Sequence, residues 1–212
     1  MTEIESQGNL FVVAAPSGAG KTSLVKALIE SSNNIEVAIS HTTRAKRKGE
    51  SDGVNYYFVS QAEFRALQQQ AGFAEFAEVF GNYYGTSRSE IERITSNGRD
   101  IVLEIDWQGA DQIRSKIMDA RTIFILPPSM RELSNRLHGR GQDDQDTISA
   151  RMAEAIDEIS HYREFDYIVI NDNFEVALSD MKRLVRGEGE DLRLDACQEK
   201  LKPLLNGLLP ST

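Results

Sequence analysis

Short apolar runs recur along the chain with helical patterns between them, and this alternation predicts an α/β fold. Runs typical of buried strands occupy residues 10–14, 35–40, 101–105, 122–126 and 167–170. Between most of them, apolar residues return every three or four positions, as in the stripe of Leu24, Ala27 and Leu28. Such alternation is typical of a doubly wound parallel sheet, whose ligands bind at the carboxyl ends of the strands.

Residues 41–100 do not follow this alternation. Two aromatic strands are predicted over 56–59 and 73–80, with a short amphipathic helix over 61–70 between them. A turn over 81–85 follows, and then a helix that opens with a capping box of Ser87 and Glu90. We therefore expect a small α+β insertion in the core, one that moves relative to the core.

The first apolar run leads into a glycine-rich loop and then into a helix. This loop predicts an ATP site made of Ala15, Pro16, Ser17, Gly18, Ala19, Gly20, Lys21 and Thr22. The glycines let the backbone turn tightly and approach an anion, and the N–H groups of the loop and the helix start then face the phosphates. Lys21 adds a positive charge at the β- and γ-phosphates, and the Thr22 hydroxyl is the expected protein ligand of Mg²⁺. Ala15 stands where the general pattern has its first glycine.

Composition narrows the class of protein. The 212 residues carry a net charge of −9, which argues against general nucleic-acid binding because that binding rests on neutralised phosphates. A local basic cluster is nevertheless present at Arg44, Lys46, Arg47 and Lys48. The single cysteine indicates a reducing, cytoplasmic location, and no apolar run reaches the roughly 20 residues of a membrane helix.

Seven short segments, taken in order, resemble guanylate kinases, particularly the bacterial enzymes, over about residues 9–186. They are APSGAGKT at 15–22, SHTTR at 40–44, GNYYGTSR at 81–88, DWQGA at 106–110, PPS at 127–129, GRG at 139–141 and VIND at 169–172. The resemblance implies Mg²⁺-dependent transfer of the γ-phosphoryl group from ATP to GMP. It also implies a P-loop core (9–39, 101–136 and 163–186), a GMP-binding insertion (40–100), a helical lid (137–162) and a C-terminal extension (187–212).

The same resemblance assigns the GMP site to Ser40, Arg44, Arg47, Tyr56, Glu75, Tyr84, Thr86, Glu104 and Asp106. Arginine suits the GMP phosphate because its planar fork matches a phosphate bidentately. A carboxylate at position 75 can accept from both the N1–H and the N2–H₂ of guanine, whereas adenine lacks the N1 donor. Glu104 stands where the family usually has aspartate, and Asp106 is alternatively a cap at the end of a strand.

The implied catalytic residues are Lys21, Arg44, Arg140 and Arg151, and Asn171 is placed near the adenine of ATP. The two lid arginines would stabilise charge on the transferred phosphoryl group. For Arg151 the alternative is an ion pair with Glu154 or Glu158 on its own helix.

Three alternatives to a guanylate kinase remain at this point. One is a kinase for another nucleoside monophosphate, a second is a non-catalytic interaction module with the same fold, and a third is a regulatory GTPase. Lys21 and the lid arginines argue against the module, and the insertion argues against the GTPase. The sequence leaves open the use of dGMP, a homo-oligomer, and whether the C-terminal extension packs on the body or on a second subunit.

Overall fold

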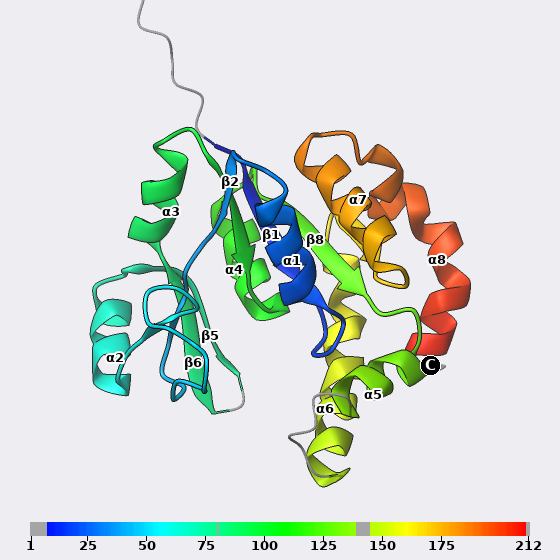
Figure 1. The fold of residues 1–212 in the computed structure, drawn as a ribbon, viewed down its shortest axis with the longest axis horizontal. Helices are drawn as coiled ribbons and strands as arrows, with labels where there is room; N and C mark the ends of the chain where they lie inside the picture. Colours follow the sequence, from blue (N-terminus) through cyan, green and yellow to red (C-terminus); the bar gives the residue numbers. More distant parts are fainter. Residues whose placement is uncertain (1–7, 80, 139–144, 211–212) are drawn as a thin grey trace, which may run out of the picture. The chain divides into compact units, whose positions relative to one another are not determined.

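The computed structural model describes residues 8–79, 81–138 and 145–210. Its main sheet has five parallel strands in the order β2-β7-β1-β8-β9 (Figure 1). The strands are β1 (Leu10–Ala14), β2 (Ile35–Val37), β7 (Asp100–Glu104), β8 (Arg121–Leu126) and β9 (Tyr167–Ile170). Most side chains along β1, β7 and β8 are buried, as continuous apolar runs predict for strands covered on both faces. The predicted α/β class is confirmed.

The described chain separates into two compact units, and the division runs through β1. Unit 1 contains the described residues up to Val12 together with Asn33–Ala120. Unit 2 contains Val13–Ser32 and the described residues from Arg121 onward. Each unit has its own buried apolar side chains, exemplified by Phe64 and Ile113 in unit 1 and by Leu28 and Leu133 in unit 2.

Unit 1 holds a second sheet of four strands in the order β4-β3-β6-β5, which is the predicted α+β insertion. The strands are β3 (His41–Thr42), β4 (Tyr57–Phe58), β5 (Phe73–Val79) and β6 (Asn82–Ser87), and the helices of this unit are α2 (Gln61–Gln69), α3 (Arg88–Thr95) and α4 (Trp107–Lys116). Helix α2 packs on this sheet through Phe64, whose ring stacks on that of Phe73 with centroids 4.4 Å apart.

The prediction of a turn over residues 81–85 is wrong. Residues from Asn82 onward form β6, which pairs antiparallel with β5. Polar and glycine residues in this segment suggested a turn, but pairing with β5 outweighs local composition and makes Asn82–Ser87 a strand. The predicted strand over 35–40 is shorter in the structure, because β2 ends at Val37 and the next strand, β3, begins only at His41.

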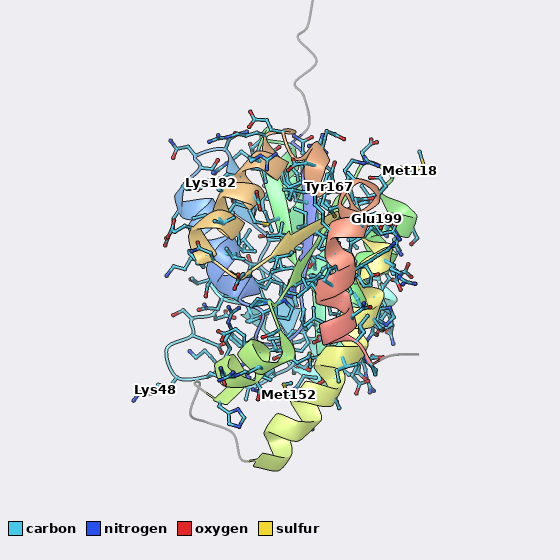
Figure 2. The ribbon with its side chains drawn as sticks, turned by 90° about the vertical axis from the view of Figure 1, so that its right-hand side faces the viewer. Lys48, Met118, Met152, Tyr167, Lys182 and Glu199 are labelled. Carbon is cyan, nitrogen blue, oxygen red and sulfur yellow. The ribbon has the colours of Figure 1, made fainter. Side chains whose placement is uncertain are left out.

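Unit 2 contains α1 (Lys21–Glu30), α5 (Met130–His138), α6 (Gln145–Ser160), α7 (Phe174–Val185) and α8 (Leu194–Leu208), with short 3₁₀ helices η1 (His161–Glu164) and η2 (Glu190–Leu192). The C-terminal extension packs on this unit: Cys197, Leu201, Leu205 and Leu208 form the buried side of α8. Tyr167 of β9, labelled in Figure 2, forms an isolated antiparallel β-bridge with Arg193, which immediately precedes α8. Among the described residues, no helix is long and apolar enough to cross a membrane.

Glu90 connects helix α3 to the segment that precedes β3. Its side chain is 5% exposed, accepts a hydrogen bond from the Ile39 N–H at 3.1 Å and forms an ion pair with Arg93 at 3.0 Å. The Ser87 hydroxyl caps α3 by accepting from the Glu90 N–H, so the Ser87 half of the predicted capping box is confirmed. The Glu90 half is wrong, because the Glu90 carboxylate accepts from Ile39 instead of from the Ser87 N–H. The Glu90 side chain is thereby free to fix Ile39, the neighbour of Ser40.

We expect Glu90→Ala to lower the free energy of unfolding by about 2 kcal/mol, because the Ile39 amide and Arg93 both lose a carboxylate partner. Urea denaturation measures this loss. The matched control is Glu92→Ala on the exposed side of the same helix, which should stay within ~0.5 kcal/mol of the parent. Equal losses in the two variants would contradict the anchoring role of Glu90.

Candidate active site

Unit 1 contains a buried carboxylate, that of Glu75. Glu75 in β5 is 3% exposed, and its Oε1 accepts a hydrogen bond from the Thr86 N–H at 2.7 Å. The pairing of β5 with β6 shifts register between Phe73 and Glu75, so strict alternation is lost and Phe73, Ala74 and Glu75 are all buried. Glu75 is buried like Ala77 two residues further along the strand, while Glu78 is exposed.

Two hydroxyl groups lie beside this carboxylate. The Ser40 Oγ and the Thr86 Oγ1 are 3.0 Å apart and hydrogen-bonded, and Thr86 is fully buried. Ser40 comes from the loop before β3, Thr86 from β6 and Glu75 from β5. The structure therefore brings together the three residues that the sequence assigned to guanine.

Asp106 occupies the position before α4 and caps that helix. Its Oδ1 accepts a hydrogen bond from the Gly109 N–H at 2.7 Å, so Asp106 is the N-cap of α4. Asp106 also acts on Glu75. Burial, and to a lesser extent the Asp106 carboxylate, raise the pKa of Glu75 to about 7, against the opposing effects of Thr86 and Lys116.

The basic cluster of unit 1 is already paired with an acidic residue. Arg44 makes a bidentate contact with Glu50, at 2.7 and 3.1 Å, and its guanidinium lies 5.5 Å from the centre of the Tyr56 ring. This hydrogen bonding to Glu50, together with a smaller effect of Tyr84, raises the pKa of Arg44 above its usual value. Arg47 is exposed, and its backbone N–H donates to Glu50 at 2.7 Å.

Tyr56 lies near both Arg44 and Glu104, the last residue of β7. Its ring meets that of Tyr84 edge-on, with centroids 5.9 Å apart. Burial, with the nearby Glu104 carboxylate and the Tyr84 phenol, raises the pKa of Tyr56 to about 12. Arg44, Tyr56, Tyr84 and Glu104 therefore form one cluster, and Glu50 belongs to it although the sequence reading missed it. Its position in the sequence could have indicated this contact, because Glu50 is the first acidic residue after Arg44, Lys46, Arg47 and Lys48.

In unit 2, the loop before α1 has the backbone of a phosphate-binding loop. Gly18 and Gly20 have φ angles of 91° and 93°, a conformation that side chains disfavour, and Lys21 begins the helix. Thr22 is exposed in the first turn of α1. A hydroxyl oxygen there fits Mg²⁺, which takes few protein ligands and completes its shell with phosphates and waters. In the part of the chain that is described, no cluster of three His, Cys, Asp or Glu side chains offers a dedicated metal cage.

Two side chains hold this loop from the same side. Asn171, which follows β9 and is 5% exposed, donates its amide to the Ala19 carbonyl at 2.7 Å. Arg136 of α5 donates to the Ala19 carbonyl at 3.4 Å and to the Asn171 carbonyl at 3.1 Å. The Asn171 side chain is thus directed at the backbone of the loop.

Helix α6 also reaches the loop. Its Glu158 carboxylate accepts a hydrogen bond from the Ser17 N–H at 2.9 Å, a contact that the sequence reading missed. Arg151 lies half-buried on the same helix. Burial raises the pKa of Glu154 on this helix, and the charge of Arg151 opposes that rise. Arg140, the other predicted lid arginine, lies outside the described residues.

The family model for guanylate kinase matches residues 7–188. The chain belongs to the guanylate kinase family. The chain is 51% identical over 206 residues to the guanylate kinase of Salmonella typhimurium strain LT2, an alignment that covers 96% of this chain and 99% of the relative. It is 50% identical, with the same coverage, to the guanylate kinase of Escherichia coli K12. The crystal structure of guanylate kinase from Anaplasma phagocytophilum superimposes with a TM-score of 0.72 at 35% identity and covers 94% of each chain.

The raised pKa of Glu75 makes the stability of this guanylate kinase family member depend on pH. Between about pH 4.5 and 7 the folded chain holds a proton on Glu75 that the unfolded chain releases, so stability falls as pH rises through this range. We expect Glu75→Gln, which stays neutral, to gain up to ~3 kcal/mol relative to the parent between pH 5 and pH 8.

Urea denaturation at a series of pH values measures this difference. Glu78→Gln, an exposed position on the same strand, is the matched control, and its difference from the parent should stay constant. A constant difference for Glu75→Gln as well would mean that the folded state does not perturb this carboxyl.

Proposed function

We propose that this protein is a guanylate kinase that transfers the γ-phosphoryl group of ATP to GMP, giving ADP and GDP. The observation that carries the proposal is the cluster of Glu75, Ser40 and Thr86 in a chain half identical to bacterial guanylate kinases. A buried carboxylate next to two hydroxyls complements guanine, which presents N1–H and N2–H₂ as donors and O6 and N7 as acceptors.

Selection against adenine follows from the burial of Glu75. Guanine satisfies the ionised carboxylate with two donors, whereas AMP would leave it buried with an unpaired charge. Sites that hydrogen-bond their substrate reject an analogue that lacks the group by about 10⁴-fold. The hydroxyls of Ser40 and Thr86 are hydrogen-bonded to each other, so the one that accepts in this pair can turn its own donor toward O6 or N7.

The GMP phosphate is proposed to bind at Arg44, Arg47, Tyr56 and Tyr84. Glu50 holds the Arg44 guanidinium by its Nη1 and Nη2 atoms, so the fork is oriented before any phosphate arrives. Binding there brings an acceptor oxygen of GMP into a site where arginine offsets its charge. Glu104 and Asp106 are assigned to the same side of the substrate.

ATP is proposed to bind at the glycine loop of residues 15–22, with Lys21 at its β- and γ-phosphates and Asn171 and Arg136 holding the loop in shape. Mg²⁺ held by Thr22 and the phosphates would offset negative charge on ATP. Arg140 and Arg151 are proposed to neutralise charge on the transferred group. We also propose a reducing, cytoplasmic location, which the free and buried Cys197 supports.

A coupled assay of ADP release tests this function. With ATP and Mg²⁺, we expect turnover with GMP to exceed that with AMP, CMP, UMP or dTMP by about 10⁴-fold in kcat/KM. Preference for another monophosphate would keep the phosphate chemistry and overturn the guanine assignment. Absence of turnover with every monophosphate would favour the non-catalytic interaction module. Lys21→Ala serves as the inactive reference, with GMP binding retained and turnover lower by at least ~10²-fold.

The base-reading role of Glu75 has its own test. We expect Glu75→Gln to lower kcat/KM for GMP by about 10²-fold while KM for ATP changes less than about threefold, because an amide cannot accept from both guanine donors. Glu78→Gln on the same strand is the control and should change neither value. Equal losses for both nucleotides would show that Glu75 is a structural residue.

A further inference from the structure

Gly109 lies against the carboxylate of Glu75. It is the third residue of α4 and is buried, and a Cβ built on it would be 2.5 Å from the Glu75 Oε2 and 3.2 Å from the Glu75 Cδ. Real Cβ atoms essentially never come within 3.0 Å of another heavy atom, so even alanine would force a shift. The carboxylate therefore occupies the space that a side chain at position 109 would fill.

The surrounding contacts prevent α4 and β5 from moving apart to relieve such a clash. Gln112 donates to the Phe76 carbonyl at 2.6 Å and accepts from the Phe76 N–H at 3.3 Å, one residue after Glu75. Lys116 donates to the Ala74 carbonyl at 2.7 Å, one residue before it. The helix is thus tied to the strand on both sides of Glu75, and a methyl group at position 109 would have to displace the carboxylate.

The carboxylate itself has little freedom to move without loss. Its Oε1 is held by the Thr86 N–H at 2.7 Å, so rotating Oε2 away from position 109 would distort that hydrogen bond too. The Gly109 backbone is equally fixed, because its N–H donates to the Asp106 cap. Glycine is a poor helix former, so helix propensity does not account for its presence here.

We propose that Gly109 is a specificity-determining positioning residue, whose missing side chain lets the Glu75 carboxylate lie against α4 in the orientation that receives guanine. The inference rests on the proposed base-reading role of Glu75. It assigns to the first turn of α4 a share in nucleotide selection, although Gly109 has no functional group of its own.

The test is Gly109→Ala. We expect KM for GMP to rise about 10- to 100-fold, because misplacing a reading group by a fraction of an ångström to 1 Å has effects of that size, while kcat and KM for ATP change less than about threefold. Gly207→Ala is the matched control: Gly207 also lies in a helix, α8, and a Cβ there meets no atom within 4 Å. All of its constants should stay at the parent values.

A double-mutant cycle separates contact with Glu75 from a general effect on α4. In a Glu75→Ala background, Gly109→Ala should lower kcat/KM for GMP by less than about twofold, because no carboxylate is left to displace. The same factor in both backgrounds would overturn the inference. If Gly109→Ala does not fold alone, the thermal midpoint replaces the kinetic readout: recovery in the double variant supports the contact, and no recovery overturns it.

Two results distinguish a failure of this inference about Gly109 from a failure of the proposed role of Glu75. If Glu75→Gln affects GMP and ATP equally, the role of Glu75 itself is wrong. If Glu75→Gln selectively weakens GMP but a folded Gly109→Ala leaves KM for GMP unchanged, only the positioning role of Gly109 is wrong.

Discussion

The polar site of unit 1 depends on keeping the Glu75 carboxylate in the interior. A buried carboxylate without partners is strongly unfavourable, so the residues around it have to supply hydrogen bonds and exact space. The Thr86 N–H donates a hydrogen bond to one oxygen of Glu75, and Gly109 leaves room for the other oxygen. Gln112 and Lys116 then tie the helix to the strand. A bulge in β5 and a glycine in α4, each unfavourable for regular secondary structure, thus both occur at this polar site.

Unit 2 would bind an anionic ligand mainly through backbone groups. Its loop presents backbone N–H groups and a helix start to an anion, so precision depends on the path of the chain rather than on one side chain. The Ala19 carbonyl is the point where that path is fixed, because both Asn171 and Arg136 donate to it. Asn171 therefore acts on the shape of the loop, a role that its position after a strand did not reveal.

Much of this arrangement was readable from the sequence, and the missing parts have a common physical cause. Continuous apolar runs located the strands of the main sheet, and the spacing of Gly18, Gly20 and Lys21 located the loop. The contacts of Glu50 with Arg44 and of Glu158 with Ser17 were missed because only the folded chain creates them. The start of β6 was misread because pairing with β5 outweighs the turn-like composition of its residues.

The protonation of Glu75 has a thermodynamic consequence for the proposed substrate. A carboxyl with a pKa of about 7 is only partly ionised at neutral pH, whereas two guanine donors require the ionised form. GMP association would therefore expel a fraction of a proton into solution. Its apparent heat of binding would then include the ionisation enthalpy of the buffer, so calorimetry in phosphate and in Tris would yield different enthalpies for the same complex.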